Sequence, residues 1–226
     1  MNQQLTTMNK TLAQLLSILF HPLLVLTYAL LLLMALNPYA FSVRSLADKR
    51  AMILLISVFS TSFMLPAFGT ALMKPLGLIK TWGMNDKLER TGPYILSGVF
   101  YLWLYKNLDA TDQAPPLFNQ FVLGATIGLF FTFFFNIFTK ISAHAVGMGG
   151  LFGMLLLTDR AWGGGILNVS ALGGMFQLSL NVLLAIAAVL AGLVGTAQLA
   201  LGAHVPADLY RGYAAGFVAV LLAGLI

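Results

Sequence analysis

The segment from Phe118 to Phe138 contains no charged side chain and is apolar almost throughout its length. A helix needs about 20 mainly apolar residues to cross a bilayer, so this segment alone is long enough to do so. The rest of the chain is similar in character, because 59% of its residues are hydrophobic and only 8% are charged. A soluble globular protein carries about 25% charged residues. The composition therefore predicts an integral membrane protein.

The other apolar segments predict an all-α fold, a polytopic bundle of six to seven transmembrane helices. Backbone groups find no water in the bilayer core, and no segment shows the two-residue alternation of a membrane β-barrel, so the spans are expected to be helices. We interpret residues 1–226 as one integral membrane domain. Besides the segment above, the expected spans cover about 12–36, 51–73, a shorter stretch from Pro93, 143–157, 175–201 and 209–226.

Helix-breaking residues occur inside or beside these spans. His21 and Pro22 interrupt the first one, and we interpret them as a kink or packing feature rather than a ligand site. A "GMGG" run follows His144, and glycines in membrane helices commonly allow close helix packing. The sequence therefore predicts close helix packing or a kink at these positions, and packing is the favoured interpretation for the glycine-rich segment.

Charge and composition exclude several classes of function. The net charge of +5 is spread along the chain without a basic run, so nucleic acid is not an expected partner, whereas anionic lipids are compatible with it. The chain has no cysteine and only three histidines, and these show none of the spacings of a zinc site. No metal and no cofactor are therefore expected.

Three polar clusters contain most of the unusual polar residues. The first is "NDKLERTGPY" (85–94), the second "KISAH" (140–144) and the third "AHVPAD" (203–208). Two expected spans separate each cluster from the next. Because two crossings return the chain to the side it left, all three clusters are predicted to meet at one membrane face.

The first two clusters have the residue types of an anion site. Lys87 and Arg90 are three residues apart, so one helical turn would place both cations on the same face. Ser142 and His144 begin an expected helix, where free backbone N–H groups and the positive end of the dipole favour an anion. Taken alone, the two cations would be ordinary interfacial residues whose stems lie along apolar surface.

The third cluster contains His204 and Asp208, which are four residues apart and can share a helical face. The carboxylate can accept the imidazole N–H, which fixes the tautomer and leaves the other nitrogen free. Together the three clusters suit binding a phosphate, attacking it and protonating its leaving group. The simpler alternative for either His204 or His144 is a hydrogen bond to a carbonyl or a lipid headgroup near the interface.

The clusters also resemble, in order and spacing, the motifs of the type-2 phosphatidic acid phosphatase superfamily of membrane lipid phosphatases. The matching stretches are "DKLERTGP", "SAH" and "AQLALGAHVPAD", and the resemblance covers about residues 86–212. It implies a metal-independent lipid phosphate or diphosphate phosphatase that works through a phospho-histidine. It also implies membrane lipids as surroundings, and by analogy the bacterial inner (cytoplasmic) membrane with the site toward the outer face.

The resemblance also assigns roles to residues. His204 would be the nucleophile, Asp208 would orient it, and His144 would protonate the leaving group. The phosphate would be held by a set of polar groups from the first two clusters: Lys87, Arg90, Ser142 and the backbone N–H of Ala143.

The sequence departs from the family pattern at three places. In the first cluster Lys and Arg are closer together than in the family. Ala143 replaces a Gly of the second motif, and the third departure is Gln198. Gln198 stands where the third motif has a phosphate-binding Arg. Losing one charged donor to a buried phosphate costs on the order of 2–4 kcal/mol in the transition state. Arg211, one helical turn past Asp208, is the better replacement, and Lys140 is the other.

Two further functions remain open. A relative that binds a phospholipid or lipid-linked phosphate without turnover is motivated by Gln198, although it has no obvious need for His204, His144 and Asp208 together. A small transporter is motivated by the glycine-rich, Pro-interrupted helices, but it predicts charges near mid-span. The charges in this chain lie mainly at span ends, so the lipid phosphatase is the favoured hypothesis.

Overall fold

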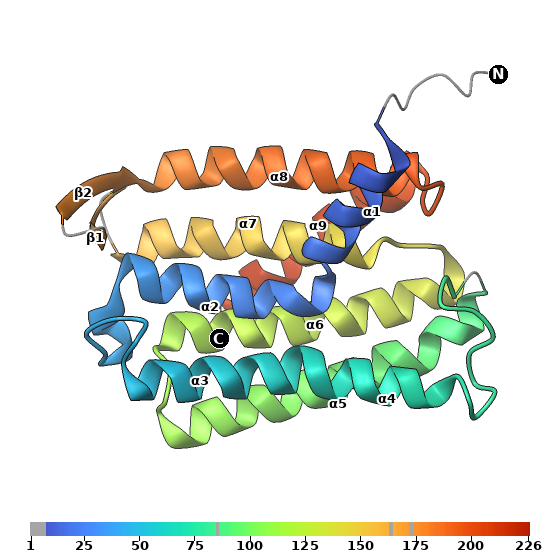
Figure 1. The fold of residues 1–226 in the computed structure, drawn as a ribbon, viewed down its shortest axis with the longest axis horizontal. Helices are drawn as coiled ribbons and strands as arrows, with labels where there is room; N and C mark the ends of the chain where they lie inside the picture. The colour runs from blue at the N-terminus through green and yellow to red at the C-terminus, as the bar shows by residue number, and fades with distance from the viewer. Residues whose placement is uncertain (1–7, 85, 163–164, 172–173) are drawn as a thin grey trace.

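The computed structural model describes residues 8–84, 86–162, 165–171 and 174–226. The chain is a bundle of long helices with a short hairpin at one end (Figure 1). The α-helices are α1 (Lys10–Leu19), α2 (Val25–Leu36), α3 (Lys49–Phe59), α4 (Leu65–Met73), α5 (Lys87–Thr111), α6 (Pro116–Phe138), α7 (Ala143–Trp162), α8 (Leu180–Ala200) and α9 (Pro206–Ala223). The short elements are η1 (Pro22–Leu24), η2 (Pro38–Phe41), η3 (Ser60–Met64), β1 (Ile166–Ala171) and β2 (Gly174–Ser179).

Four helical segments are long and apolar enough to cross a membrane. They are Lys10–Leu36, Lys49–Met73, α6 and α8, as judged over the described residues. The prediction of a helical membrane protein is thus supported, but six to seven spans are not confirmed. Helices α5, α7 and α9 pack in the same bundle, but each of them contains charged residues, which lower its mean hydropathy.

The chain is helical, as predicted, and the segment 166–179 is a short exception within it. It forms an antiparallel hairpin in which Ile166 is paired with Ser179 and Ala171 with Gly174, so α8 begins only at Leu180. The sequence "LNVSA" alternates apolar and polar residues, and so does "FQLS"; this two-residue period is typical of a strand. The expected helical span over 175–201 therefore began too early, inside β2.

The first expected span is broken at His21 and Pro22, as the sequence indicated. α1 ends at Leu19, and His21 Nδ1 accepts a hydrogen bond from the Leu23 N–H at 3.4 Å at the start of η1. Pro22 has no N–H to continue the first helix. As a result α1 does not continue along α2 but crosses to the C-terminal part of α8 (Figure 1).

Helices α7 and α9 lie side by side and approach closely through glycines. A Cβ at Gly149 would collide with the backbone of Tyr213, and a Cβ at Gly216 would collide with the carbonyl oxygen of Val146. Only residues without a side chain permit this backbone-to-backbone distance. The packing interpretation of the glycine-rich segment is therefore confirmed.

The topology brings three loops to the same end of the bundle. The connections α4–α5, α6–α7 and α8–α9 lie at the right in Figure 1, together with α1, whereas the hairpin lies at the opposite end. Consecutive long helices run in opposite directions. The three polar clusters are consequently at one end, as the count of crossings predicted.

Candidate functional site

A cavity of about 840 Å³ lies between the helices and reaches the end of the bundle that carries the three loops. This volume is within the range of ligand sites in proteins, roughly 300–1,000 Å³. At the loop end its lining contains charged and polar side chains from four parts of the chain: Ser17, His21, Arg90, His144, Gln198 and His204.

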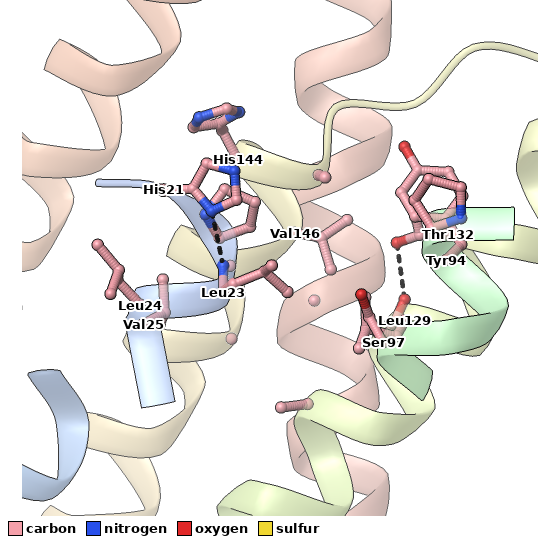
Figure 2. Close-up of a pocket in the computed structure, with 18 of the residues that line it drawn as sticks. His21, Leu23, Leu24, Val25, Tyr94, Ser97, Leu129, Thr132, His144 and Val146 are labelled. Atoms are coloured by element: carbon pink, nitrogen blue, oxygen red, sulfur yellow. Dashed lines mark hydrogen bonds between the residues drawn. The ribbon is translucent and has the colours of Figure 1, made fainter. Parts of the chain in front are cut away.

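Away from the loop end the cavity wall is mainly apolar. Leu26, Phe121 and Val220 line this part, which we call the apolar part of the cavity. Its few polar side chains include Ser97 and Thr132, and the Thr132 hydroxyl is occupied by a bond of 2.7 Å to the Gly128 carbonyl (Figure 2). A ligand that filled the whole cavity would therefore have a polar head and an apolar body.

His204 and Asp208 form a hydrogen-bonded pair at the polar end. His204 Nδ1 lies 3.3 Å from Asp208 Oδ2, and the side chain of Asp208 is 6% exposed. The same oxygen also accepts the backbone N–H of Val205 at 3.3 Å. The predicted pairing is therefore present, but the shared helical face is not: His204 precedes α9, and Asp208 in the first turn reaches back to it as a capping residue does.

The surroundings of His204 keep its imidazole neutral. Burial is the main cause that lowers the pKa of His204 to about 4, and the nearby charges of Lys140 and Arg90 act in the same direction, whereas the bond to Asp208 opposes them. Because the carboxylate can only accept, Nδ1 carries the proton. The Nε2 lone pair is then available as a nucleophile near neutral pH.

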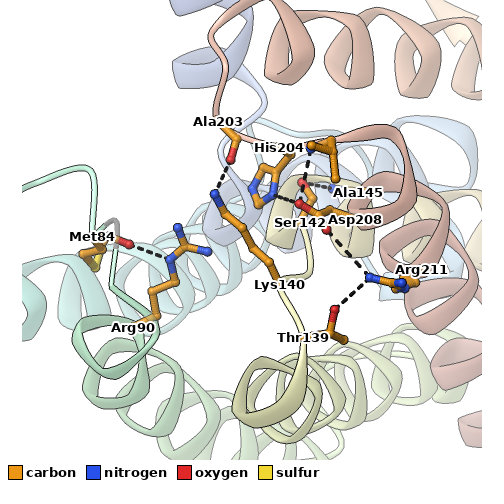
Figure 3. Close-up of polar contacts among 11 residues, drawn as sticks. Met84, Arg90, Thr139, Lys140, Ser142, Ala145, Ala203, His204, Asp208 and Arg211 are labelled. Atoms are coloured by element: carbon orange, nitrogen blue, oxygen red, sulfur yellow. Dashed lines mark hydrogen bonds and ion pairs between the residues drawn. The ribbon is translucent and has the colours of Figure 1, made fainter.

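Two cations flank this pair. Arg90 lines the cavity and donates from Nε to the Met84 carbonyl at 2.7 Å, and Lys140 donates from Nζ to the Ala203 carbonyl at 2.6 Å. Figure 3 shows both side chains extending toward the loop that carries His204. Burial and the charge of Arg90 lower the pKa of Lys140. Lys87 is the first residue of α5, but its side chain lies outside the part that the structure describes.

The start of α7 joins the second cluster to the third. Ser142 is completely buried, and its hydroxyl accepts the Ala145 N–H at 3.4 Å, as an N-cap does. Its own N–H donates to the Asp208 carbonyl at 3.2 Å. Ala143, the first residue of α7, lines the cavity, and the N–H groups of a first helical turn have no partner within the helix. The side chain of Ser142 thus serves the helix, and the backbone at Ala143 is the group placed to meet an anion.

Arg211 is not among the residues that line the cavity. Its guanidinium donates to the Thr139 hydroxyl at 2.8 Å and lies 3.8 Å from Asp208 Oδ1, and 52% of the side chain is exposed (Figure 3). Arg211 therefore supports Asp208 from the outer side. Lys140 does not line the cavity either, but of the two cations considered as replacements for the missing Arg it is the one beside His204.

His144 is bound by a residue that sequence reasoning missed. His144 Nε2 lies 3.0 Å from the Ser17 carbonyl oxygen and 3.3 Å from the Ser17 hydroxyl. Gln198, which is 3% exposed, donates to the same hydroxyl at 2.9 Å. The imidazole of His21 packs edge-on to that of His144, with ring centroids 5.9 Å apart (Figure 2).

A sequence signal for this contribution did exist. The buried Ala13 and the partly buried Ser17 and His21 are spaced by four residues, and small or polar residues at that spacing are typical of the packed face of a membrane helix. The signal identifies the face but not its partner, since the contact with His144 spans 127 residues of sequence.

Within the described residues there is no group of three or more His, Cys, Asp or Glu side chains that could hold a metal ion. The site offers instead a neutral nucleophilic imidazole, a second imidazole, two cations and the start of a helix. These groups suit an anion such as phosphate.

No family model, no curated protein and no solved structure matches the chain.

Proposed function

We propose that the protein is a metal-independent phosphatase that hydrolyses a lipid phosphate or diphosphate through a phospho-histidine intermediate. The observation that carries this proposal is the neutral, oriented His204 at the polar end of a largely apolar cavity. The motif resemblance described above leads to the same activity. By analogy with that family we place the protein in the bacterial inner membrane, with the site toward the outer face.

The reaction would proceed in two balanced steps. His204 Nε2 attacks phosphorus, the bond from phosphorus to the leaving oxygen breaks, and His144 gives that oxygen a proton. The resulting phospho-imidazolium keeps its Nδ1 proton toward Asp208, whose negative charge stabilises it. Water then attacks phosphorus, His144 takes a proton from the water, and inorganic phosphate and neutral His204 are released.

Phosphate binding would come from groups that surround His204. Arg90 and Lys140 supply positive charge, and the Ala143 N–H supplies a donor at the positive end of α7. Lys87 would be a further phosphate-binding residue, because its spacing from Arg90 and the motif resemblance both assign it to the phosphate. With Lys140 beside His204, the site retains a second cation near the phosphate despite Gln198.

The lipid chain would occupy the apolar part of the cavity. Its wall of Leu, Val and Phe side chains is suited to an acyl or prenyl chain, while the phosphate lies among the cations. The substrate class is therefore a lipid with a terminal phosphate or diphosphate, such as phosphatidate, phosphatidylglycerophosphate, a polyprenyl diphosphate or a lipid A phosphate.

A second candidate is binding of a lipid phosphate without turnover. Two observations favour it: Gln198 brings no charge to the site, and His144 Nε2 is already bound to Ser17. In this case the same cavity and cations would hold the lipid, but no phosphate would be released.

Phosphate release by the detergent-purified protein separates the two candidates. The assay uses a panel of the lipids named above with a chelator present, and it compares the intact protein with His204→Ala. We expect chelator-resistant release that the substitution abolishes. Binding of a radiolabelled lipid phosphate without release, equal in both proteins, would contradict the phosphatase and favour the second candidate.

A further inference from the structure

The N-terminal helix α1 contributes a polar group to the cavity wall that the chemistry above does not use. Ser17 lies between His144 on α7 and Gln198 on α8, and it contacts both. Neither partner is close to it in sequence, because the separations are 127 and 181 residues. The same helix is otherwise lightly packed on its outer side, where Leu15 is 61% and Ile18 is 70% exposed.

We propose that Ser17, held in place by Gln198, is a positioning residue for His144: it binds the Nε2 proton and leaves Nδ1 as the nitrogen that exchanges a proton with the substrate. This inference rests on the proposed phosphatase function. It adds a fourth segment of the chain to the site assembled from the three polar clusters.

The tautomer of His144 follows from the chemistry of its partner. A backbone carbonyl oxygen has lone pairs but no proton, so it can only accept a hydrogen bond. At 3.0 Å from this oxygen, Nε2 of His144 must therefore be the donor. In a neutral imidazole the other nitrogen, Nδ1, is then an acceptor, and when the ring is protonated it is the Nδ1 proton that is available to a leaving group.

Gln198 fixes the carbonyl by fixing the residue that carries it. Its amide donates to the Ser17 hydroxyl at 2.9 Å, and its burial on α8 gives it few alternative partners. The Ser17 hydroxyl thus accepts from Gln198 and lies within reach of His144 Nε2 as a second acceptor. In the family that the sequence resembles, this position carries a cation for the phosphate. In this chain the neutral amide joins α1 to the site.

The groups around His144 are consistent with this assignment. The ring of His21, which follows α1, packs against the ring of His144. His21 Nδ1 already accepts the Leu23 N–H at 3.4 Å. Gln198 faces the same network from α8 without a charge. Among the described residues that contact His144, Ser17 is therefore the one that selects which nitrogen carries the proton.

The first test observes the tautomer directly. The chain has three histidines, so ¹⁵N-histidine labelling of the full-length protein in detergent gives few signals, which His21→Gln and His204→Gln assign. We expect a single Nε2–H tautomer for His144 in the intact protein. Ser17→Ala keeps the backbone carbonyl but, like Gln198→Leu, removes the hydroxyl contact that anchors it, so the carbonyl can move away from Nε2 and we expect a mixture of tautomers in both variants. Ser17→Thr keeps the hydroxyl and should preserve the single tautomer. Gln14→Ala, at an exposed position of the same helix, is the control for the integrity of α1.

The second test is kinetic. We expect Ser17→Ala and Gln198→Leu each to lower kcat about tenfold, which corresponds to about 1.4 kcal/mol, with KM within about twofold and the pH profile shifted. The double variant should be no worse than either single one, because both remove the same contact. An increase in kcat would show that α1 restrains His144, and this result overturns the inference.

The two tests also separate failure of the inference from failure of the proposed function. If the His144 tautomer is the same in Ser17→Ala and the intact protein, the Ser17 hydroxyl and its contact with Gln198 do not position His144, and the inference is wrong even if phosphate is released. If the tautomer changes as expected but the intact protein releases no phosphate, the positioning stands and the phosphatase proposal fails.

Discussion

Gly216→Ala tests whether the close contact of α7 and α9 sets the geometry of the site. The Cβ added at this position would overlap the Val146 carbonyl oxygen and would lie 2.8 Å from the Val146 carbonyl carbon and 2.9 Å from the Gly150 nitrogen. All three atoms are backbone of the opposite helix, so no side-chain rotation relieves the contact. Carbon atoms pack best at about 3.5–4.0 Å, and α9 therefore has to move away from α7.

The magnitude follows from two opposing effects. Overpacking costs about 1–3 kcal/mol, and a contact with backbone on every side belongs at the upper end, about 3 kcal/mol. Ala is the better helix former by about 1 kcal/mol. The free energy of unfolding is therefore expected to fall by about 2 kcal/mol, which for a chain of this length lowers Tm by about 4–8 °C.

Gly192→Ala is the matched control, because a Cβ at Gly192 of α8 meets no atom within 4 Å. Thermal unfolding of both variants in the same detergent, followed by circular dichroism, gives the comparison. Phosphate release should also decrease in Gly216→Ala, since the Ser142 N–H that donates to the Asp208 carbonyl at 3.2 Å moves with α7. A Tm for Gly216→Ala equal to or above that of the intact protein would refute the reasoning.

The remaining predictions concern the site. Asp208→Asn removes the charge that orients His204 and should lower kcat at least hundredfold. The control Asp109→Asn, at an exposed position, should leave kcat unchanged. Equal effects of the two substitutions would contradict the role of the His204–Asp208 pair. Because the pKa of His204 is lowered to about 4, release should persist at pH 5.5 and fall as the pH approaches 4. In the unfolded chain the His204 imidazole binds a proton near pH 6.5, whereas in the folded protein it does so only near pH 4. The contribution of neutral His204 to the free energy of unfolding is therefore complete above pH 6.5 and is lost as the pH falls from 6.5 to 4. Unfolding measured across this range should show the decrease. Lys140→Gln removes a charge that lowers the pKa of His204, and an NMR titration should find that pKa higher; no change would place Lys140 too far from the imidazole. Ser97→Leu narrows the apolar part of the cavity and should raise KM for long-chain lipid phosphates but not for p-nitrophenyl phosphate, and an equal effect on both substrates would exclude this part as the chain site.

Gln198 was interpreted from sequence only as a missing charge. In the structure the residue is buried and bound to Ser17, so it has a structural partner of its own. This contact explains why a neutral residue is accommodated at this position: an Arg there would need to bring its charge into the same buried network, which is costly without a paired anion.

The sequence by itself determined the class of the protein and the end of the bundle where the polar residues meet. Hydropathy is a local property, so the apolar segments could be found one at a time, and the number of segments between clusters decides on which side each cluster lies. The pairing of His204 with Asp208 was also predictable, because the two residues are four apart and the start of a helix brings them together.

Only the tertiary structure decided which residues complete the site. The break at His21 and Pro22 was visible in the sequence, but the direction that α1 takes after it was not, and that direction brings Ser17 to His144 and Gln198. The position of Arg211 outside the cavity and the hairpin before α8 were likewise not predicted. The direction of α1 and the position of Arg211 were hidden for the same physical reason. Contacts between distant helices depend on the direction in which the helices cross and on the close approach that glycines allow, and neither is encoded in the local period of apolar residues.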